Sequence, residues 1–290
     1  MFEETFERNV AYLSEDKNYV ELLNKVNSVR QFFENYSFLQ FGRNFEILSL
    51  LGKKFSSHSV LQSIEQTLYS IENCCKIGSL SDTYILLRKY RDDLFFYLYI
   101  TVVSNEQKMA IEEAIQNNEC RKDEKREKAV RNIDSWTEDK LNALHISEVL
   151  KYVGQSSQLA EAVSRYNLHS SFENIGKKLN DFVHANGVSF YNKLYPQYSE
   201  GEFERVCKDI IDILNYITTI FVFLSALCKP LSIMSHDYVD YLDCGETPPI
   251  ESEYWVPPFI IEFFQTKAHY LDESCMKYLQ DETNMQLLGN

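Results

Sequence analysis

The chain contains no proline before Pro196, and glycine is scarce throughout, with nine glycines and six prolines in 290 residues. Together these two residue types make up about 5 % of the chain, against roughly 12 % in average proteins. Sheets, barrels and sandwiches need many tight turns, and tight turns depend on glycine and proline. We therefore expect an all-α protein, a multi-helix bundle built from long amphipathic helices.

Apolar residues recur at positions i, i+3, i+4 and i+7 in several segments, which is the spacing of an amphipathic helix. We expect a helix from about Asp82 to Val103 that is apolar on nearly all sides. Another should cover residues 171–184, a long helix should end at Cys228, and a last one should run from about Pro258 to Leu279. Two N-terminal segments show the pattern most clearly, one at Leu22, Leu23, Val26, Val29, Phe32 and Phe33, the other at Val60, Leu61, Ile64, Leu68 and Ile71.

Residues 119–128 carry nine charged side chains of mixed sign in ten positions. Such a segment is typical of a solvent-exposed helix or a projecting hairpin. We accordingly divide the chain into an N-terminal helical bundle (1–118), a charged helical connector (119–145) and a C-terminal helical region with an acidic tail (146–290).

Residues 213–228 contain no charged side chain. This run is shorter than the ~20 residues needed to cross a bilayer, and Asp212 precedes it directly. We expect a fully buried central helix; the alternative is a membrane-associated protein anchored by this segment. The first residues are charged and polar, unlike a signal peptide, and the seven cysteines contain no C-x-x-C pair, so we expect a cytoplasmic protein.

The net charge of −14 is concentrated near the C-terminus, where residues 230–290 hold 11 acidic and two basic residues. Within this part, residues 246–258 contain two pairs of prolines, which suit extended backbone. An acidic surface repels nucleic acid in general. We therefore expect the acidic segment to be a solubilising surface or a docking face for a basic protein partner.

The segment KKLNDFVH, residues 177–184, resembles the signature of HEPN domains, a superfamily of small all-α bundles. That signature is an arginine, usually followed by a polar residue, and a histidine after four to six intervening positions. Asn180 matches the polar position and His184 the histidine. Leu179 stands where the arginine is expected, and Lys178 keeps a cation one position earlier.

Many HEPN domains are metal-independent RNA endonucleases of toxin–antitoxin and anti-phage systems. The resemblance implies that His184 acts as acid and base, that Lys178 binds the phosphate, and that Arg88 and Arg91 support the site from another core helix. It also implies an RNA substrate, a homodimer, and no metal or cofactor. The chemistry needs a titratable imidazole and a cation that stabilises the charged transition state. Lysine supplies the charge without the planar two-donor geometry of arginine.

The same residues fit structural roles as well. A histidine before Asn-Gly is favoured at a helix end by the helix dipole, and Arg88 can pair with Asp92 one turn along the same helix. His236, Asp237, Asp240 and Asp243 would line one side of a helix as metal ligands do. No matching ligand cluster is evident elsewhere, so we expect a solvated acidic face and no metal. Phosphate-loop, dinucleotide-binding, zinc-protease and nucleophile-elbow motifs are all missing from the sequence.

Three hypotheses follow. The first is a helical interaction or accessory protein, placed by the resemblance in a bacterial defence or toxin–antitoxin system. The second is a HEPN-like endoribonuclease, and the third is the membrane-associated protein anchored by residues 213–228. Whether the protein is an enzyme stays open at this stage.

Overall fold

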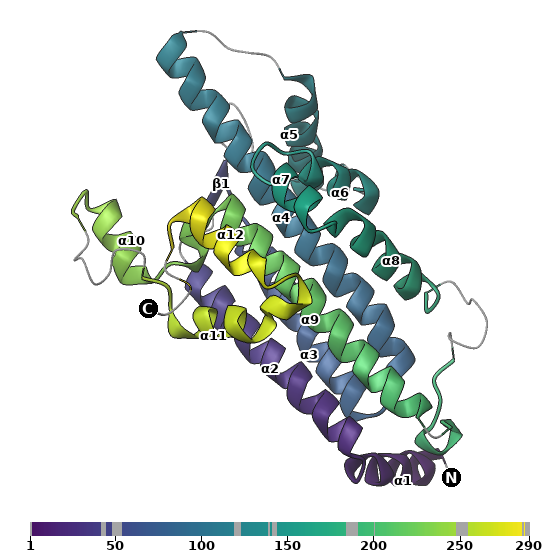
Figure 1. Ribbon diagram of the computed structural model, residues 1–290. Helices are drawn as coiled ribbons and strands as arrows, with labels where there is room; N and C mark the ends of the chain where they lie inside the picture. Colours follow the sequence, from purple (N-terminus) through teal and green to yellow (C-terminus); the bar gives the residue numbers. More distant parts are fainter. Residues whose placement is uncertain are drawn as a thin grey trace.

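The computed structural model describes residues 2–41, 45–47, 54–118, 123–138, 140, 144–183, 191–199, 201–247, 255–285 and 287. These residues form an all-α multi-helix bundle, as predicted (Figure 1). The α-helices are α1 (Phe2–Ser14), α2 (Lys17–Gln40), α3 (His58–Lys76), α4 (Leu80–Asn117), α5 (Glu124–Thr137), α6 (Ile146–Gly154), α7 (Ala160–Arg165), α8 (Leu168–Asn180), α9 (Glu202–Cys228), α10 (His236–Asp243), α11 (Pro258–Lys267) and α12 (Ser274–Thr283).

Short elements connect some of these helices. Two strands, β1 (Phe45–Ile47) and β2 (Lys54–Ser56), pair in antiparallel fashion between α2 and α3, with Phe45 opposite Ser56. The sequence pattern gave no sign of this hairpin. Three single-turn 3₁₀ helices complete the described elements: η2 (Tyr195–Gln197), η3 (Pro230–Ile233) and η5 (Ala268–Tyr270).

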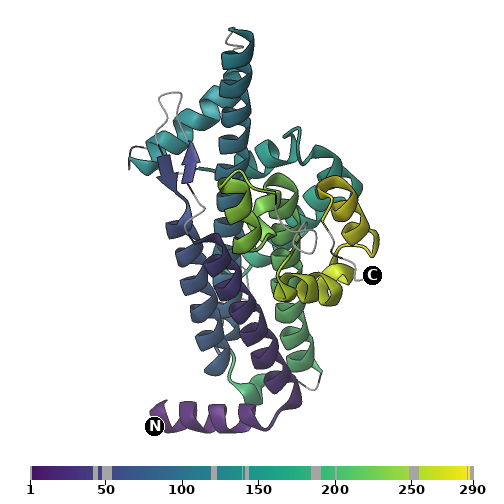
Figure 2. The ribbon, with the colours of Figure 1, turned by 90° about the vertical axis from the view of Figure 1, so that its left-hand side faces the viewer.

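Four long helices form the centre of the molecule. α2 packs on α3, α3 on α4, α4 on α9, and α9 on α2, so that the four helices enclose one core. Figures 1 and 2 show them side by side, with α1 crossing one end of the group. This arrangement follows from the apolar spacing in the sequence, because the side chains of α2 that repeat with helical period are its buried ones: Tyr19, Leu22, Val26, Val29 and Phe33.

The uncharged segment 213–228 is the second half of α9, and nearly all of its side chains are buried, which confirms the prediction of a central helix. Its two threonines are hydrogen-bonded inside the bundle: Thr218 donates to the carbonyl of Leu214 (2.7 Å) and shares a hydrogen bond with Tyr90 (2.8 Å), and Thr219 donates to the carbonyl of Asn215 (2.7 Å). Among the described residues, α9 alone has the length and hydropathy of a membrane span, and most of that stretch is covered by the other helices.

The helix expected to end near Val103 continues as α4 to Asn117, and its end projects beyond the bundle (Figure 1). Ser104 and Gln107 are still buried there, because α5 and α6 pack against this part of α4. Asn118 then ends the helix in the left-handed conformation, at φ 55°. The charged segment 119–128 thus contributes the first turn of α5, while residues 119–122 lie outside the described residues.

The prediction of a single last helix from about Pro258 to Leu279 is wrong, because this segment forms two helices, α11 and α12. Between them lie η5 and residues 271–273, and the Asp272 carboxylate accepts a hydrogen bond from the backbone N–H of Ser274 (2.7 Å), the first residue of α12. Of the stretch expected to be extended, residues 255–257 are described and are not helical, while 248–254 lie outside the described residues.

One hydrophobic core runs through the described chain. It joins residues of α2, α3 and α4 with residues of α9, α11 and α12, including Phe33, Tyr90, Phe221 and Phe264. The core therefore crosses the expected boundaries at residues 118 and 145.

Candidate functional site

The residues of the HEPN-like segment lie at the end of α8. α8 ends at Asn180, and residues 181–183 form turns, so the helix is shorter than the predicted 171–184. Lys178 and Asn180 are described, whereas His184 lies outside the described residues. The structure therefore places two of the three predicted catalytic residues.

Lys178 forms an ion pair with Asp209 of α9. The other oxygen of that carboxylate accepts a hydrogen bond from the Tyr84 hydroxyl of α4 (2.7 Å). Burial and the nearby Asp209 carboxylate raise the pKa of Tyr84. The Tyr84 ring is stacked on Phe182, with 3.9 Å between the ring centres. Lys178 thus belongs to a polar link that joins α8, α9 and α4.

Arg88 and Arg91 both engage Asp92 on their own helix. Arg91 is only 5 % exposed, and its Nε and Nη2 donate to Asp92 Oδ1 at 2.8 and 2.6 Å. Arg88 Nε lies 3.9 Å from Asp92 Oδ2. The predicted pairing of Arg88 with Asp92 is confirmed.

The structure brings Arg91 against α8, as a supporting residue of the predicted site would require. Its guanidinium lies against Gly176, one helical turn before Asn180. Oδ1 of Asn180 is buried and has no hydrogen-bond partner among the described residues. Residues from α4 and α8 therefore meet along one seam. The three cations of this seam, Arg88, Arg91 and Lys178, all have carboxylate partners, so a phosphate would have to displace Asp92 or Asp209.

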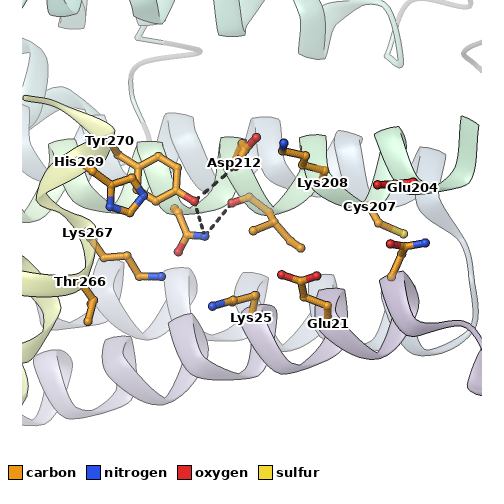
Figure 3. A pocket seen from close by; sticks show the side chains of 13 residues that line it. Glu21, Lys25, Glu204, Cys207, Lys208, Asp212, Thr266, Lys267, His269 and Tyr270 are labelled. Carbon is orange, nitrogen blue, oxygen red and sulfur yellow. Dashed lines mark hydrogen bonds between the residues drawn. The ribbon is translucent and has the colours of Figure 1, made fainter. Parts of the chain in front are cut away.

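A pocket of ≈ 470 Å³ lies between α2, α9 and the α11–η5 segment (Figure 3). No motif pointed to it, because its walls come from three segments that are far apart in the sequence. Charged side chains of both signs line it, Glu21 and Lys25 from α2, Glu204, Lys208 and Asp212 from α9, and Lys267 from α11, together with His269 of η5.

A hydrogen-bonded chain closes one wall of this pocket. The Tyr270 hydroxyl donates to Asp212 Oδ1 (3.4 Å) and accepts from Asn215 Nδ2 (3.3 Å), which also donates to the carbonyl of Ile211 (2.9 Å). Cys207 also lines the pocket, but burial raises the pKa of its thiol to about 12. That thiol is therefore a poor nucleophile at neutral pH.

A second surface feature lies where the end of α2 meets η3 and α10. Phe38 of α2 is 74 % exposed, and Phe41, directly after the helix, is 64 % exposed and contacts His58 at the start of α3. The Phe38 ring contacts the ring of His236, the first residue of α10, with 6.2 Å between centres. Leu231 and Trp255 are also exposed, and Trp255 is held beside α10 because its carbonyl accepts from the Ser235 N–H (3.3 Å). We call this surface the α2–α10 face: Phe38, Leu231, Trp255 and the exposed acidic residues Asp237, Asp240 and Asp243.

The residues considered as metal ligands, His236, Asp237, Asp240 and Asp243, all lie on α10. Asp237, Asp240 and Asp243 are exposed. Among the described residues, no group of three or more histidine, cysteine, aspartate or glutamate side chains is arranged to hold a metal ion.

Comparison of the chain with protein families, with curated proteins and with solved structures finds no match.

Proposed function

We propose that this protein is a helical interaction protein whose α2–α10 face binds a basic, apolar segment of a partner protein. The observation that carries the proposal is the exposure of large aromatic side chains, Phe38 above all, beside an acidic helix. Exposed apolar groups that gather at one place are typical of protein interaction sites, and aromatic residues are enriched among the residues that dominate binding energy.

The charges around these rings decide which kind of partner fits. Asp237, Asp240, Asp243 and Glu246 are exposed on α10 or directly after it, and residues 230–247 contain no lysine or arginine. A complementary surface would carry lysine or arginine around an apolar centre. An amphipathic helix with basic flanks has this pattern.

The packing of α10 supports the same function. Val239 is its only buried residue, so α10 contributes little to the core and its exposed groups are not needed for folding. The resemblance of residues 177–184 to HEPN domains is the reason to place such an accessory protein in a bacterial defence or toxin–antitoxin system.

Binding of a short amphipathic peptide of lysine and leucine tests the proposal. Trp255 lies on the face and Trp136 is the only other tryptophan, so in a Trp136→Phe background the fluorescence reports on the face itself. We expect saturable binding of the peptide and weaker binding of a peptide with the same composition and no amphipathic order. Phe38→Ser should lower the affinity roughly tenfold, as expected for a central aromatic contact.

Ile115→Ser is the matched control, because Ile115 is 75 % exposed on the projecting end of α4. This variant should bind the peptide as the parent protein does. Equal affinity of the Phe38→Ser variant and the parent protein would contradict the proposal, as would equal binding of the two peptides. Point variants are preferable to deletion of the tail, because Ile260, Phe264 and Leu279 belong to the core.

A second candidate, the HEPN-like endoribonuclease, is favoured by one observation. Arg91 of α4 contacts Gly176 of α8, close to Lys178 and Asn180. Induced expression of the wild-type chain and of His184→Ala tests it through growth and RNA integrity. RNA cleavage by the wild type alone would support the ribonuclease, whereas intact RNA and equal growth in both strains would exclude it.

A further inference from the structure

Two lysines face each other across the pocket in Figure 3. Lys25 of α2 and Lys267 at the end of α11 point their amino groups toward one another from opposite walls. Neither amino group has a hydrogen bond or an ion pair with a described residue. Their charges repel each other, and the pKa of Lys267 is lowered by its burial and, to a smaller extent, by the charge of Lys25. An anion placed between the two amino groups would remove the repulsion.

A buried acceptor on the pocket wall also lacks a partner. Asn215 is 1 % exposed, and its Oδ1 has no hydrogen bond among the described residues. Turning the amide over does not help, because Oδ1 would then face the carbonyl of Ile211, to which Nδ2 now donates. A buried acceptor without a donor is costly. A ligand that brings a donor to this wall would remove that cost.

The remaining charges extend this pattern. Glu21 of α2 and Glu204, Lys208 and Asp212 of α9 also line the pocket, and the Asp212 carboxylate already accepts from Tyr270. The pocket therefore offers two cations at one place and acceptors around them. A ligand that matches both carries an anionic group and a cationic donor in the same small molecule.

We propose that this pocket binds a small phosphorylated amine, a phosphate monoester that also carries an ammonium group. The phosphate lies between Lys25 and Lys267, because a dianion balances two lysine charges and a single carboxylate balances one. The ammonium group faces Asn215 Oδ1 and the carboxylates. A volume of ≈ 470 Å³ is in the range of small-molecule sites.

This site is separate from the α2–α10 face. Lys25 and Phe38 are 13 positions apart on α2, roughly 20 Å along the helix axis. The pocket and the α2–α10 face share no residue, so an experiment that contradicts one proposal leaves the other intact.

Titration calorimetry of the full chain with three probes tests the ligand class. O-phosphoethanolamine carries the phosphate and the ammonium group, ethyl phosphate lacks the ammonium, and β-alanine has a carboxylate in place of the phosphate. We expect O-phosphoethanolamine to bind most tightly of the three. Tighter binding of β-alanine would overturn the phosphate assignment, and no measurable heat with any probe would overturn the site.

Variants then test the individual contacts. Lys25→Met and Lys267→Met should each weaken O-phosphoethanolamine binding roughly tenfold, the usual effect of losing a charged hydrogen bond. The surface variant Lys151→Met on α6 is the control and should bind as wild type. An equal loss in this control, or no loss in the two pocket variants, would contradict the proposal.

Asn215→Leu separates the ammonium contact from general damage to the pocket. In this variant O-phosphoethanolamine should bind no better than ethyl phosphate, while the affinity for ethyl phosphate stays at the wild-type value. If the variant loses both probes equally, or retains the wild-type preference for the amine, Asn215 does not contact the ligand.

Discussion

The guanidinium of Arg91 lies directly against the backbone of Gly176, so that α4 and α8 approach where α8 has no side chain. A Cβ atom built at Gly176 would overlap Nη1 of Arg91. Arg91 is itself buried and holds Asp92 through two hydrogen bonds, so it has little freedom to move aside. Glycine here is required by packing, because the helical φ at this position suits any residue.

Gly176→Ala should therefore lower the free energy of unfolding, although the same change in an unobstructed helix raises it by about 1 kcal/mol. We expect a net loss of about 1–2 kcal/mol, because an overpacking cost of up to about 3 kcal/mol exceeds the helix gain; urea denaturation measures this loss. Gly154→Ala is the control, because the new Cβ would lie 3.5 Å from Val163, an ordinary contact. In an Arg91→Met background, Gly176→Ala should become neutral or stabilising. A loss that persists in that background would show that Arg91 is not the obstacle.

The Tyr84–Asp209–Lys178 link can be divided into a hydrogen bond and an ion pair by two substitutions at Asp209. Asp209→Asn keeps an acceptor for the buried Tyr84 hydroxyl and loses only the ion pair. Lys178 is about half exposed, so this loss should cost at most about 1 kcal/mol. Asp209→Leu leaves the Tyr84 hydroxyl without an acceptor and should cost about 1–3 kcal/mol.

Urea denaturation of both variants checks this difference, with Lys178→Met as a further comparison. Lys178→Met should match Asp209→Asn, since both remove the ion pair and retain an acceptor for Tyr84. Equal stability of Asp209→Asn and Asp209→Leu would mean that the tyrosine contributes nothing through this bond.

Buried tyrosines should make the protein sensitive to alkaline pH. Burial raises the pKa of Tyr84 and Tyr90, and burial with nearby Cys207 and Glu202 raises that of Tyr198 to about 12. The unfolded chain ionises near pH 10, so above this pH the folded state holds more protons than the unfolded state. The stabilisation that these protonated tyrosines provide is therefore fully present below pH 10. The free energy of unfolding should fall as the pH rises from 10 toward 12.

Denaturation with urea at pH 9, 10 and 11 measures this loss. In Tyr90→Phe, the free energy of unfolding should decrease less steeply with pH, because one tyrosine with a raised pKa is removed. This variant also loses the hydrogen bond to Thr218. Tyr12→Phe, at an exposed position, should leave the slope unchanged. A slope in Tyr90→Phe as steep as in the wild type would contradict the prediction.

The fold could be predicted from local pattern because helix formation and burial leave a periodic trace in the sequence. The scarcity of glycine and proline indicated an all-α chain, and the uncharged run 213–228 indicated the buried helix. Helix ends were predicted less well. α4 continues past Val103 because α5 and α6 cover it, and this tertiary contact has no signature in the residues of α4 alone.

The candidate sites show the same limit more strongly. Pairing of Arg88 with Asp92 is local and could be predicted, whereas the Lys178–Asp209 pair joins residues 31 positions apart. The pocket between Lys25 and Lys267 depends on α2 and α11, which have no sequence relationship to each other. The position of Phe38 off the apolar side of α2 indicates its exposure, but its contact with His236 of α10 has no local signal.

The pH dependence of phosphate binding should report on the two facing lysines. Lys267 binds the phosphate as an ammonium group, and its pKa in the free protein is lowered by burial and by Lys25. The affinity for phosphate should therefore fall as the pH rises through the pKa of Lys267. Because this pKa is lowered, the fall should occur below about pH 10.4, the usual value of an unperturbed lysine side chain. Lys25→Met removes the like charge, so Lys267 should lose its proton at a higher pH. The affinity for phosphate should then also fall at a higher pH than in the wild type.

Ethyl phosphate is the probe for this measurement, because it has no ammonium group of its own and is a dianion above about pH 7. Calorimetric titrations from pH 7 to 10.5 should be compared for wild type, Lys25→Met and Lys267→Met. The other titratable groups that line the pocket are common to all three proteins: Glu21 from α2, Glu204, Cys207, Lys208 and Asp212 from α9, and His269 and Tyr270 from η5. A difference between the variants therefore arises from the lysines. The affinity of Lys267→Met for ethyl phosphate should be low and should vary least with pH. Identical dependence of affinity on pH in wild type and Lys25→Met would refute the coupling between the two amino groups.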